Sequence, residues 1–136
     1  MNEIAKSDPA RRDEVFSETA HRKNLPEAVV EKDFWVCWML EQVFSLESMK
    51  DWLLFKGGTS LSKVFHAIER FSEDIDLAVD YRALGFAGEK DPRHPGISKT
   101  RRMKIQAEIL AECQRFIASE FLTELRGSCE AVLGER

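Results

Sequence analysis

Apolar residues in the first 50 positions recur with the spacing of helices. Ser7-Asp8-Pro9 is a typical helix start, because aspartate caps free backbone N–H groups and proline is tolerated at the first helical position. This helix is expected to run to about Ala20 or His21. A second helix is predicted from Leu25-Pro26-Glu27 to about Phe44. Its apolar positions include Val30, Phe34, Cys37, Trp38 and Val43, so most of this helix is expected to be buried.

A different pattern follows from residue 52. The continuous apolar run WLLF, Trp52 to Phe55, stops at a glycine pair and predicts a strand that is buried on both faces. A short helix is predicted next, from an apolar stripe at helical spacing. The stripe consists of Leu61, Val64, Phe65 and Ile68.

Strict alternation marks the stretch DIDLAVD, from Asp74 to Asp80. Alternation at every second position predicts a strand, whose apolar residues face the core while its aspartates share the other face. The residues expected to face the core are Ile75, Leu77 and Val79.

Residues 81–97 contain glycine and proline without periodicity and predict a long loop. A helical pattern then covers about 98–133, with Gly127 as the candidate break. The fold class expected is α/β (α+β), with a short mixed sheet flanked by helices. We expect one domain, 1–136, made of N-terminal helices (1–50), a strand–turn–helix–strand core (51–80), a loop (81–97) and a long helical segment (98–136). Two strands alone form a marginal sheet.

Composition narrows the class of protein. A chain of 136 residues with 43% hydrophobic and 32% charged residues is typical of one globular, soluble domain. The net charge of -4 argues against a surface coated in positive charge for nucleic acid. Neither a secretory signal nor an apolar run long enough to span a membrane is visible. Three cysteines without a CxxC motif favour a reducing, cytoplasmic setting.

The first candidate site is the turn Gly57-Gly58-Thr59-Ser60. A strand that enters such a turn and continues as a helix presents backbone N–H groups at the helix N-terminus, where a phosphate can approach closely. Thr59 or Ser60 would cap the helix. The alternative is an ordinary tight turn with an ordinary cap.

The second candidate site is the pair Asp74 and Asp76. Two residues apart on one strand, their carboxylates lie on the same face and disfavour each other's ionised form unless a cation is present. Hard oxygen ligands select Mg²⁺ or Mn²⁺. The alternative is the solvated polar face of an edge strand. Phosphate turn and carboxylate pair together meet the needs of metal-assisted nucleotidyl or phosphoryl transfer.

These residues resemble a known family. GGTSLSKVF, followed by RFSEDIDLAV, is similar to the nucleotidyltransferase superfamily with the polymerase-beta-like fold, and in particular to the AbiEii/AbiGii-type nucleotidyltransferase toxins. The earlier block EKDFWVCWML is similar to the N-terminal helix of that branch. The three blocks span Glu31 to Val79, and the gap between Gly58 and Asp74 is somewhat longer than usual.

The resemblance implies roles for individual residues. Asp74 and Asp76 match the metal-binding carboxylates, and Ser72 matches a serine close to the reacting phosphates. Nucleotide binding is implied for Gly57, Gly58, Thr59, Ser60, Lys63 and Arg70, although Lys63 is equally well read as a solvent-facing lysine. Lys32 and Asp33 match the N-terminal block without an assigned role.

The implied function is Mg²⁺-dependent transfer of a nucleoside monophosphate from a nucleoside triphosphate (NTP) to an acceptor hydroxyl, with tRNA as the acceptor class. The implied role is the toxin of a toxin–antitoxin pair, with a cognate antitoxin as partner. The third carboxylate and C-terminal lobe of such enzymes find no match, so the chain is expected to correspond to the N-terminal portion. The alternative is a catalytically inactive remnant that binds nucleotide, RNA or a partner protein. A homodimer that completes the sheet is also expected.

Overall fold

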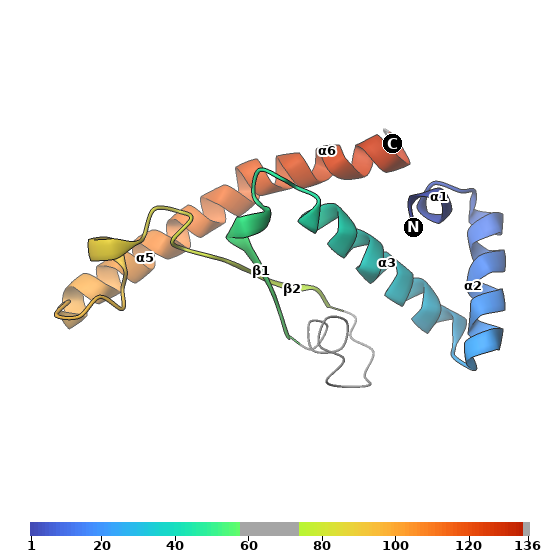
Figure 1. Cartoon of the computed structure of the whole chain (residues 1–136), viewed down its shortest axis with the longest axis horizontal. Coiled ribbons are helices and arrows are strands. Elements are labelled where there is room, and N and C mark those ends of the chain that lie inside the picture. The colour runs from blue at the N-terminus through green and yellow to red at the C-terminus, as the bar shows by residue number, and fades with distance from the viewer. Residues whose placement is uncertain (58–73, 135–136) are drawn as a thin grey trace.

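The computed structural model describes residues 1–57 and 74–134, and helices predominate among them (Figure 1). The α-helices are α1 (Asn2–Ala5), α2 (Pro9–Lys23), α3 (Glu27–Phe44), α5 (Lys99–Phe116) and α6 (Leu122–Leu133). The strands β1 (Leu53–Lys56) and β2 (Asp76–Val79) pair with each other, and the short helical turns are η1 (Lys50–Trp52), η2 (Gly88–Lys90) and the π-helical η3 (Ile117–Phe121). The α+β class is confirmed, although the short sheet expected to be mixed is antiparallel over its described strands. The helix predicted around 61–68 lies outside the described residues.

The first long helices begin where the sequence predicts. The Asp8 carboxylate accepts a hydrogen bond from the Arg11 backbone N–H at 3.0 Å and so caps α2, with Pro9 at its first position. Asn24 then ends α2 in the left-handed conformation, at φ 53°. The second helix also begins after Pro26 and ends at Phe44 as predicted, whereas α1 carries no signal that would have revealed it.

Aromatic side chains join α2 to α3. Phe16 lies 5.3 Å from Phe34, between ring centroids, and Phe34 and Trp35 are 5.1 Å apart. Trp38 is only 2% exposed, and its indole N–H donates to the Asn2 side-chain oxygen at 2.8 Å. This hydrogen bond satisfies the one polar atom of a buried indole and fixes α1 against α3.

A long helical rod formed by α5, η3 and α6 runs along one side of the molecule (Figure 1). The expected break at Gly127 is wrong, because α6 passes through that glycine. The irregularity lies earlier, in η3, where π-helical hydrogen bonding links residue i to i+5. This widened turn brings Phe116 and Phe121, five residues apart, close to the same side with ring centroids 6.2 Å apart.

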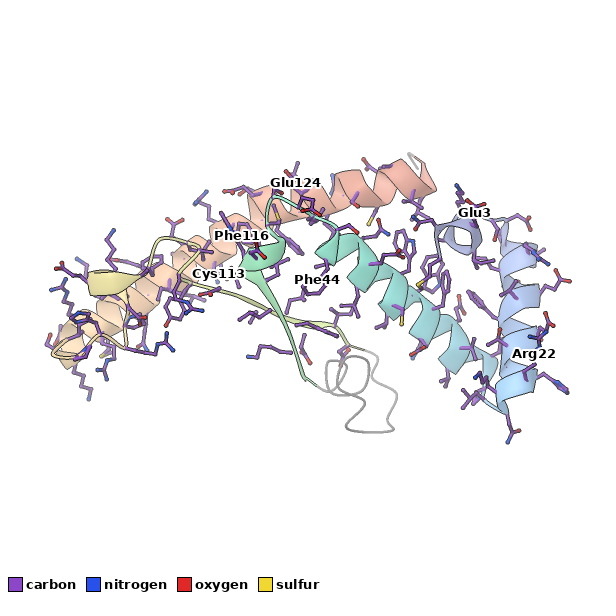
Figure 2. The ribbon with its side chains drawn as sticks, in the orientation of Figure 1. Glu3, Arg22, Phe44, Cys113, Phe116 and Glu124 are labelled. Atoms are coloured by element: carbon purple, nitrogen blue, oxygen red, sulfur yellow. The ribbon has the colours of Figure 1, made fainter. Side chains whose placement is uncertain are left out.

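The core lies where the rod crosses the end of α3 and the beginning of β1, and Phe116 occupies that crossing (Figure 2). Its buried members are Val43, Leu46, Met49, Leu53 and Phe116. Trp52 packs on Phe116 with a centroid separation of 5.4 Å. The core therefore fixes the base of the two-stranded ribbon against both long helices.

The ribbon formed by β1 and β2 extends away from this core (Figure 1). Leu53 faces Val79 across the pair, and Lys56 faces Asp76. Leu77 and Val79 pack against the core, as alternation predicts. The prediction that β1 is buried on both faces is wrong, because Leu54 is 50% exposed in the part of the chain that the structure describes.

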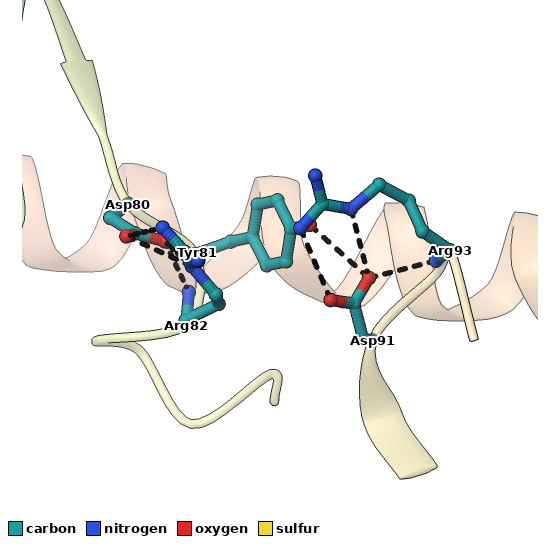
Figure 3. Close-up of polar contacts among 5 residues, drawn as sticks. All are labelled: Asp80, Tyr81, Arg82, Asp91 and Arg93. Atoms are coloured by element: carbon teal, nitrogen blue, oxygen red, sulfur yellow. Dashed lines mark hydrogen bonds and ion pairs between the residues drawn. The ribbon is translucent and has the colours of Figure 1, made fainter. Parts of the chain in front are cut away.

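The loop after β2 is held by two aspartate–arginine pairs (Figure 3). Asp80 accepts from the Arg82 guanidinium at 2.6 Å, and Asp91 pairs with Arg93 at 3.3 Å. The Tyr81 hydroxyl donates to Asp91 at 3.2 Å and links the start of the loop to the residue that follows η2. The described residues 81–97 form the predicted loop, in which η2 is the one 3-10 helix. No helix in the described ranges is both long and apolar enough to cross a membrane.

Candidate active site

Gly57 and Asp76 lie close together in the candidate site. Gly57 follows β1 directly and has φ +73°, a conformation that glycine adopts without strain. A Cβ placed on Gly57 would lie 1.9 Å from the Asp76 Oδ2 atom and 2.8 Å from its Cγ. The Asp76 carboxylate therefore occupies the space that a side chain at position 57 would need. Gly57, the first residue of the predicted phosphate turn, therefore lies beside Asp76 of the predicted metal pair.

The two aspartates lie at the far end of the ribbon from the core. β2 begins at Asp76, so the strand is shorter than the predicted 74–80 and Asp74 precedes it. Exposure still alternates, since Asp74 and Asp76 are exposed while Ile75 and Leu77 are half-buried. Both carboxylates are therefore accessible from solvent, as metal ligands shared with a substrate must be.

An open groove lies on the α3 side of Asp74, with a volume of about 660 Å³. This groove, here named the α3 groove, is lined by Glu31, Lys32, Trp35, Val36, Asp74 and Ile75. The N-terminal block therefore borders the carboxylate pair. Sequence reasoning assigns no role to Lys32, Glu31 or Trp35, although all three stand in the quoted block EKDFW.

Lys56 is a further residue that sequence reasoning missed. It precedes Gly57 and faces Asp76 across the ribbon, so a cation and a carboxylate occupy opposed positions of the pair. The lysine before the glycine pair was visible in the string FKGG. It adds positive charge beside the place where phosphate is expected.

Several predicted site residues lie outside the described ranges. They are Gly58, Thr59, Ser60, Lys63, Arg70 and Ser72. Their roles stay predictions. Among the residues predicted for the site, the structure places Gly57, Asp74 and Asp76.

The described donors suit Mg²⁺ better than zinc. Two exposed carboxylates supply hard oxygen atoms, and Mg²⁺ commonly takes one or two carboxylates together with water and substrate phosphates. Among residues 1–57 and 74–134, no group of three or more histidine, cysteine or acidic side chains is placed to hold a metal ion. A third protein carboxylate is thus not supplied by the part of the chain described.

Asp80, the third aspartate of DIDLAVD, has a different environment. Hydrogen bonds from the Arg82 side chain and backbone N–H lower the pKa of its carboxyl to about 2. This carboxylate is engaged in closing the turn after β2 (Figure 3). Its role as a turn former separates it from the two aspartates nearer the ribbon end.

One comparison with known proteins gave a match. A family model described as "Nucleotidyl transferase AbiEii toxin, Type IV TA system" matches residues 38–128. The match includes β1, Gly57, Asp74, Asp76 and most of the helical rod, and it begins within α3. Searches of curated proteins and of solved structures gave no match.

Proposed function

Since the chain belongs to the AbiEii nucleotidyltransferase toxin family, we propose that it transfers a nucleoside monophosphate from an NTP to an acceptor hydroxyl, with tRNA as the acceptor class. The observation that carries this proposal is the contact of Gly57 with the Asp76 carboxylate. In this chemistry the triphosphate and the ligands of its metal ion must lie side by side, and that contact supports such an arrangement.

Each residue has a distinct part in the proposed reaction. The missing side chain at Gly57 leaves room for the Asp76 carboxylate beside the turn, and Lys56 adds a nearby positive charge for the triphosphate. Asp74 and Asp76 would hold Mg²⁺, which supplies a lowered pKa for the acceptor hydroxyl and charge neutralisation for the leaving group. The hydroxyl oxygen bonds to the α-phosphorus, the bond from that phosphorus to the α,β-bridging oxygen breaks, and pyrophosphate leaves. The hydroxyl proton passes to solvent water.

The partners follow from the family and from this reaction. Membership in a toxin–antitoxin family implies a cognate antitoxin. NTP and RNA are the proposed substrates, the cytoplasm is the proposed compartment, and a homodimer remains a prediction. An exposed Leu54 on a ribbon of two strands is consistent with a second copy covering that face.

Label transfer tests the proposed reaction. The chain is incubated with each α-labelled NTP, Mg²⁺ and total tRNA, beside Asp76→Asn and the control Asp13→Asn. Asp13 is exposed on α2, away from the ribbon. We expect Asp76→Asn to lower transfer by at least about 100-fold. Asp13→Asn should transfer label like the unmodified chain, and the circular dichroism spectra of both variants should match that of the unmodified chain. Full transfer by Asp76→Asn would show that the assigned role is wrong.

A second candidate function is binding without chemistry. It is favoured by the lack of a third acidic ligand within the described residues. In that case the unmodified chain binds NTP in equilibrium dialysis but places no label on RNA under any condition that supports binding.

A further inference from the structure

The α3 groove combines an aromatic ring, apolar walls and charged groups at its rim. Trp35 is half-buried there, while Val36 is 7% exposed and Ile75 is half-buried. Lys32, Glu31 and Asp74 are exposed and carry the charges. A volume of about 660 Å³ is within the usual size of a small-molecule site.

Trp35 differs from its neighbour Trp38 in its exposure and in its partners. Trp38 is buried and its indole N–H is bonded to Asn2, so its role in the helix interface is complete. Trp35 meets Phe34 and Trp38 at interplanar angles of 79° and 86°, and no described ring stacks face to face on its indole. Arg12 lies over the ring, 6.0 Å from the centroid. Trp35 is thus held firmly while it also lines open space.

The position of the groove relates it to the carboxylate pair. Asp74 belongs both to the groove lining and to the predicted metal ligands, whereas Asp76 contacts Gly57 at the turn. A ligand whose phosphate lies near the two aspartates therefore has an aromatic, partly apolar groove on one side of that phosphate. A nucleobase joined through its ribose is the part of a nucleotide that suits such a groove, because every base has a π-face that can stack on an aromatic side chain.

We propose that the α3 groove binds a nucleobase of the reacting substrates, with Trp35 as the stacking platform and Lys32 as the cation beside its phosphate. The inference rests on the proposed function, because it takes the ligand to be a nucleotide. It gives the N-terminal block EKDFW a role in substrate binding. The base belongs either to the NTP or to the unpaired end of the acceptor RNA, and the two sources share one recognition chemistry.

Equilibrium dialysis tests the groove without any turnover. Labelled NTPs, a short single-stranded RNA and base-free tripolyphosphate are each measured against the unmodified chain, Trp35→Leu, Trp35→Phe and the control Trp52→Phe. Trp52 is a core tryptophan that packs on Phe116, outside the groove. We expect Trp35→Leu to weaken NTP or RNA binding by about tenfold, and Trp35→Phe to weaken it much less. Neither substitution should change the binding of tripolyphosphate, which has no base. Weakening for NTP identifies the nucleotide as the source of the base, and weakening for RNA alone identifies the acceptor.

A surface variant keeps the test valid if Trp35→Leu fails to fold. Lys32→Glu reverses a charge at the groove rim without altering the core, and Lys23→Glu at the end of α2 is its matched control. We expect Lys32→Glu to weaken nucleotide binding by about tenfold or more, and Lys23→Glu to leave it unchanged. Equal affinities for the folded Trp35 and Lys32 variants and the unmodified chain would overturn the inference. Weakened binding without label transfer would instead reject only the reaction, so the two failures are distinguishable.

Discussion

Gly57 is the residue on which the site geometry depends most directly. Two properties make it sensitive, its φ of +73° and the 1.9 Å approach of a hypothetical Cβ to the Asp76 carboxylate. Gly85 shares only the first property, with φ +90° and no atom within 4 Å of a Cβ. A comparison of substitutions at these two glycines therefore distinguishes the effect of backbone strain from the effect of displacing the carboxylate.

We expect Gly57→Ala to lower label transfer by about 100-fold, because a shift of the carboxylate by about 1 Å is enough for such a loss. Gly85→Ala should keep transfer intact and lower stability by about 1 kcal/mol, from strain alone. Both variants are assayed for transfer and for thermal unfolding. Equal label transfer by the two variants would show that the site does not depend on Gly57.

Asp80 provides a prediction of pH dependence. Its carboxyl has a pKa of about 2 in the fold, against an ordinary value of 3.8. Because the folded value is the lower one, its stabilising contribution is fully present above about pH 4 and is lost as the pH falls through about 2. A carboxyl-carbon NMR titration should place the midpoint near 2 and move it toward 3.8 in Arg82→Gln. An unchanged midpoint in Arg82→Gln would mean that Arg82 is not the cause.

At the scale of elements, α5 has two buried positions, Ile105 and Phe116, among many exposed ones. Phe116 is 1% exposed and contacts both Trp52 and Phe121, whereas Leu110 on the same helix is 60% exposed. Phe116→Ala should lower the free energy of unfolding by about 3–5 kcal/mol, and Leu110→Ala by less than about 0.5 kcal/mol. Urea unfolding measures both changes. Similar losses for the two variants would contradict this placement of the core.

The helices that could be predicted are those with local signals. Asp8-Pro9 fixes the start of α2 through a cap within three residues, and alternation identifies the core-facing Leu77 and Val79. The exposed Leu54 could not be predicted, because an apolar run does not reveal whether a second layer covers the strand. Nor could η3, since the widened turn depends on where Phe116 and Phe121 meet a distant core.

In the candidate site, too, the features with local sequence patterns could be predicted, and the features formed by distant segments could not. Asp74, Asp76 and Gly57 were predicted because each belongs to a compact local pattern. The groove beside them is formed by α3, more than 30 residues earlier in the chain, and its existence depends on how α3 packs near the beginning of β2. No local spacing encodes that approach.

At the scale of the whole molecule, α3 is joined to the helical rod by a buried polar contact. Gln42 is 4% exposed, and its side-chain oxygen accepts from the Ser128 hydroxyl of α6 at 3.0 Å. Removing the hydroxyl leaves a buried acceptor unpaired, so Ser128→Ala should lower the free energy of unfolding by about 1–3 kcal/mol. In a Gln42→Leu background the same change should be much smaller, which a double-mutant cycle measures by denaturant unfolding. Additive losses would show that the two residues are not coupled.

The close contact of Gly57 with Asp76 also has a genetic consequence. Every missense change of a single nucleotide in a glycine codon introduces a residue that has a Cβ, and at position 57 that atom would enter the space of the Asp76 carboxylate. Only synonymous changes of this codon therefore leave the contact intact. If the chain arrests the growth of a cell that lacks the antitoxin, selection for surviving colonies should recover substitutions of many kinds at codon 57, and few at codon 85.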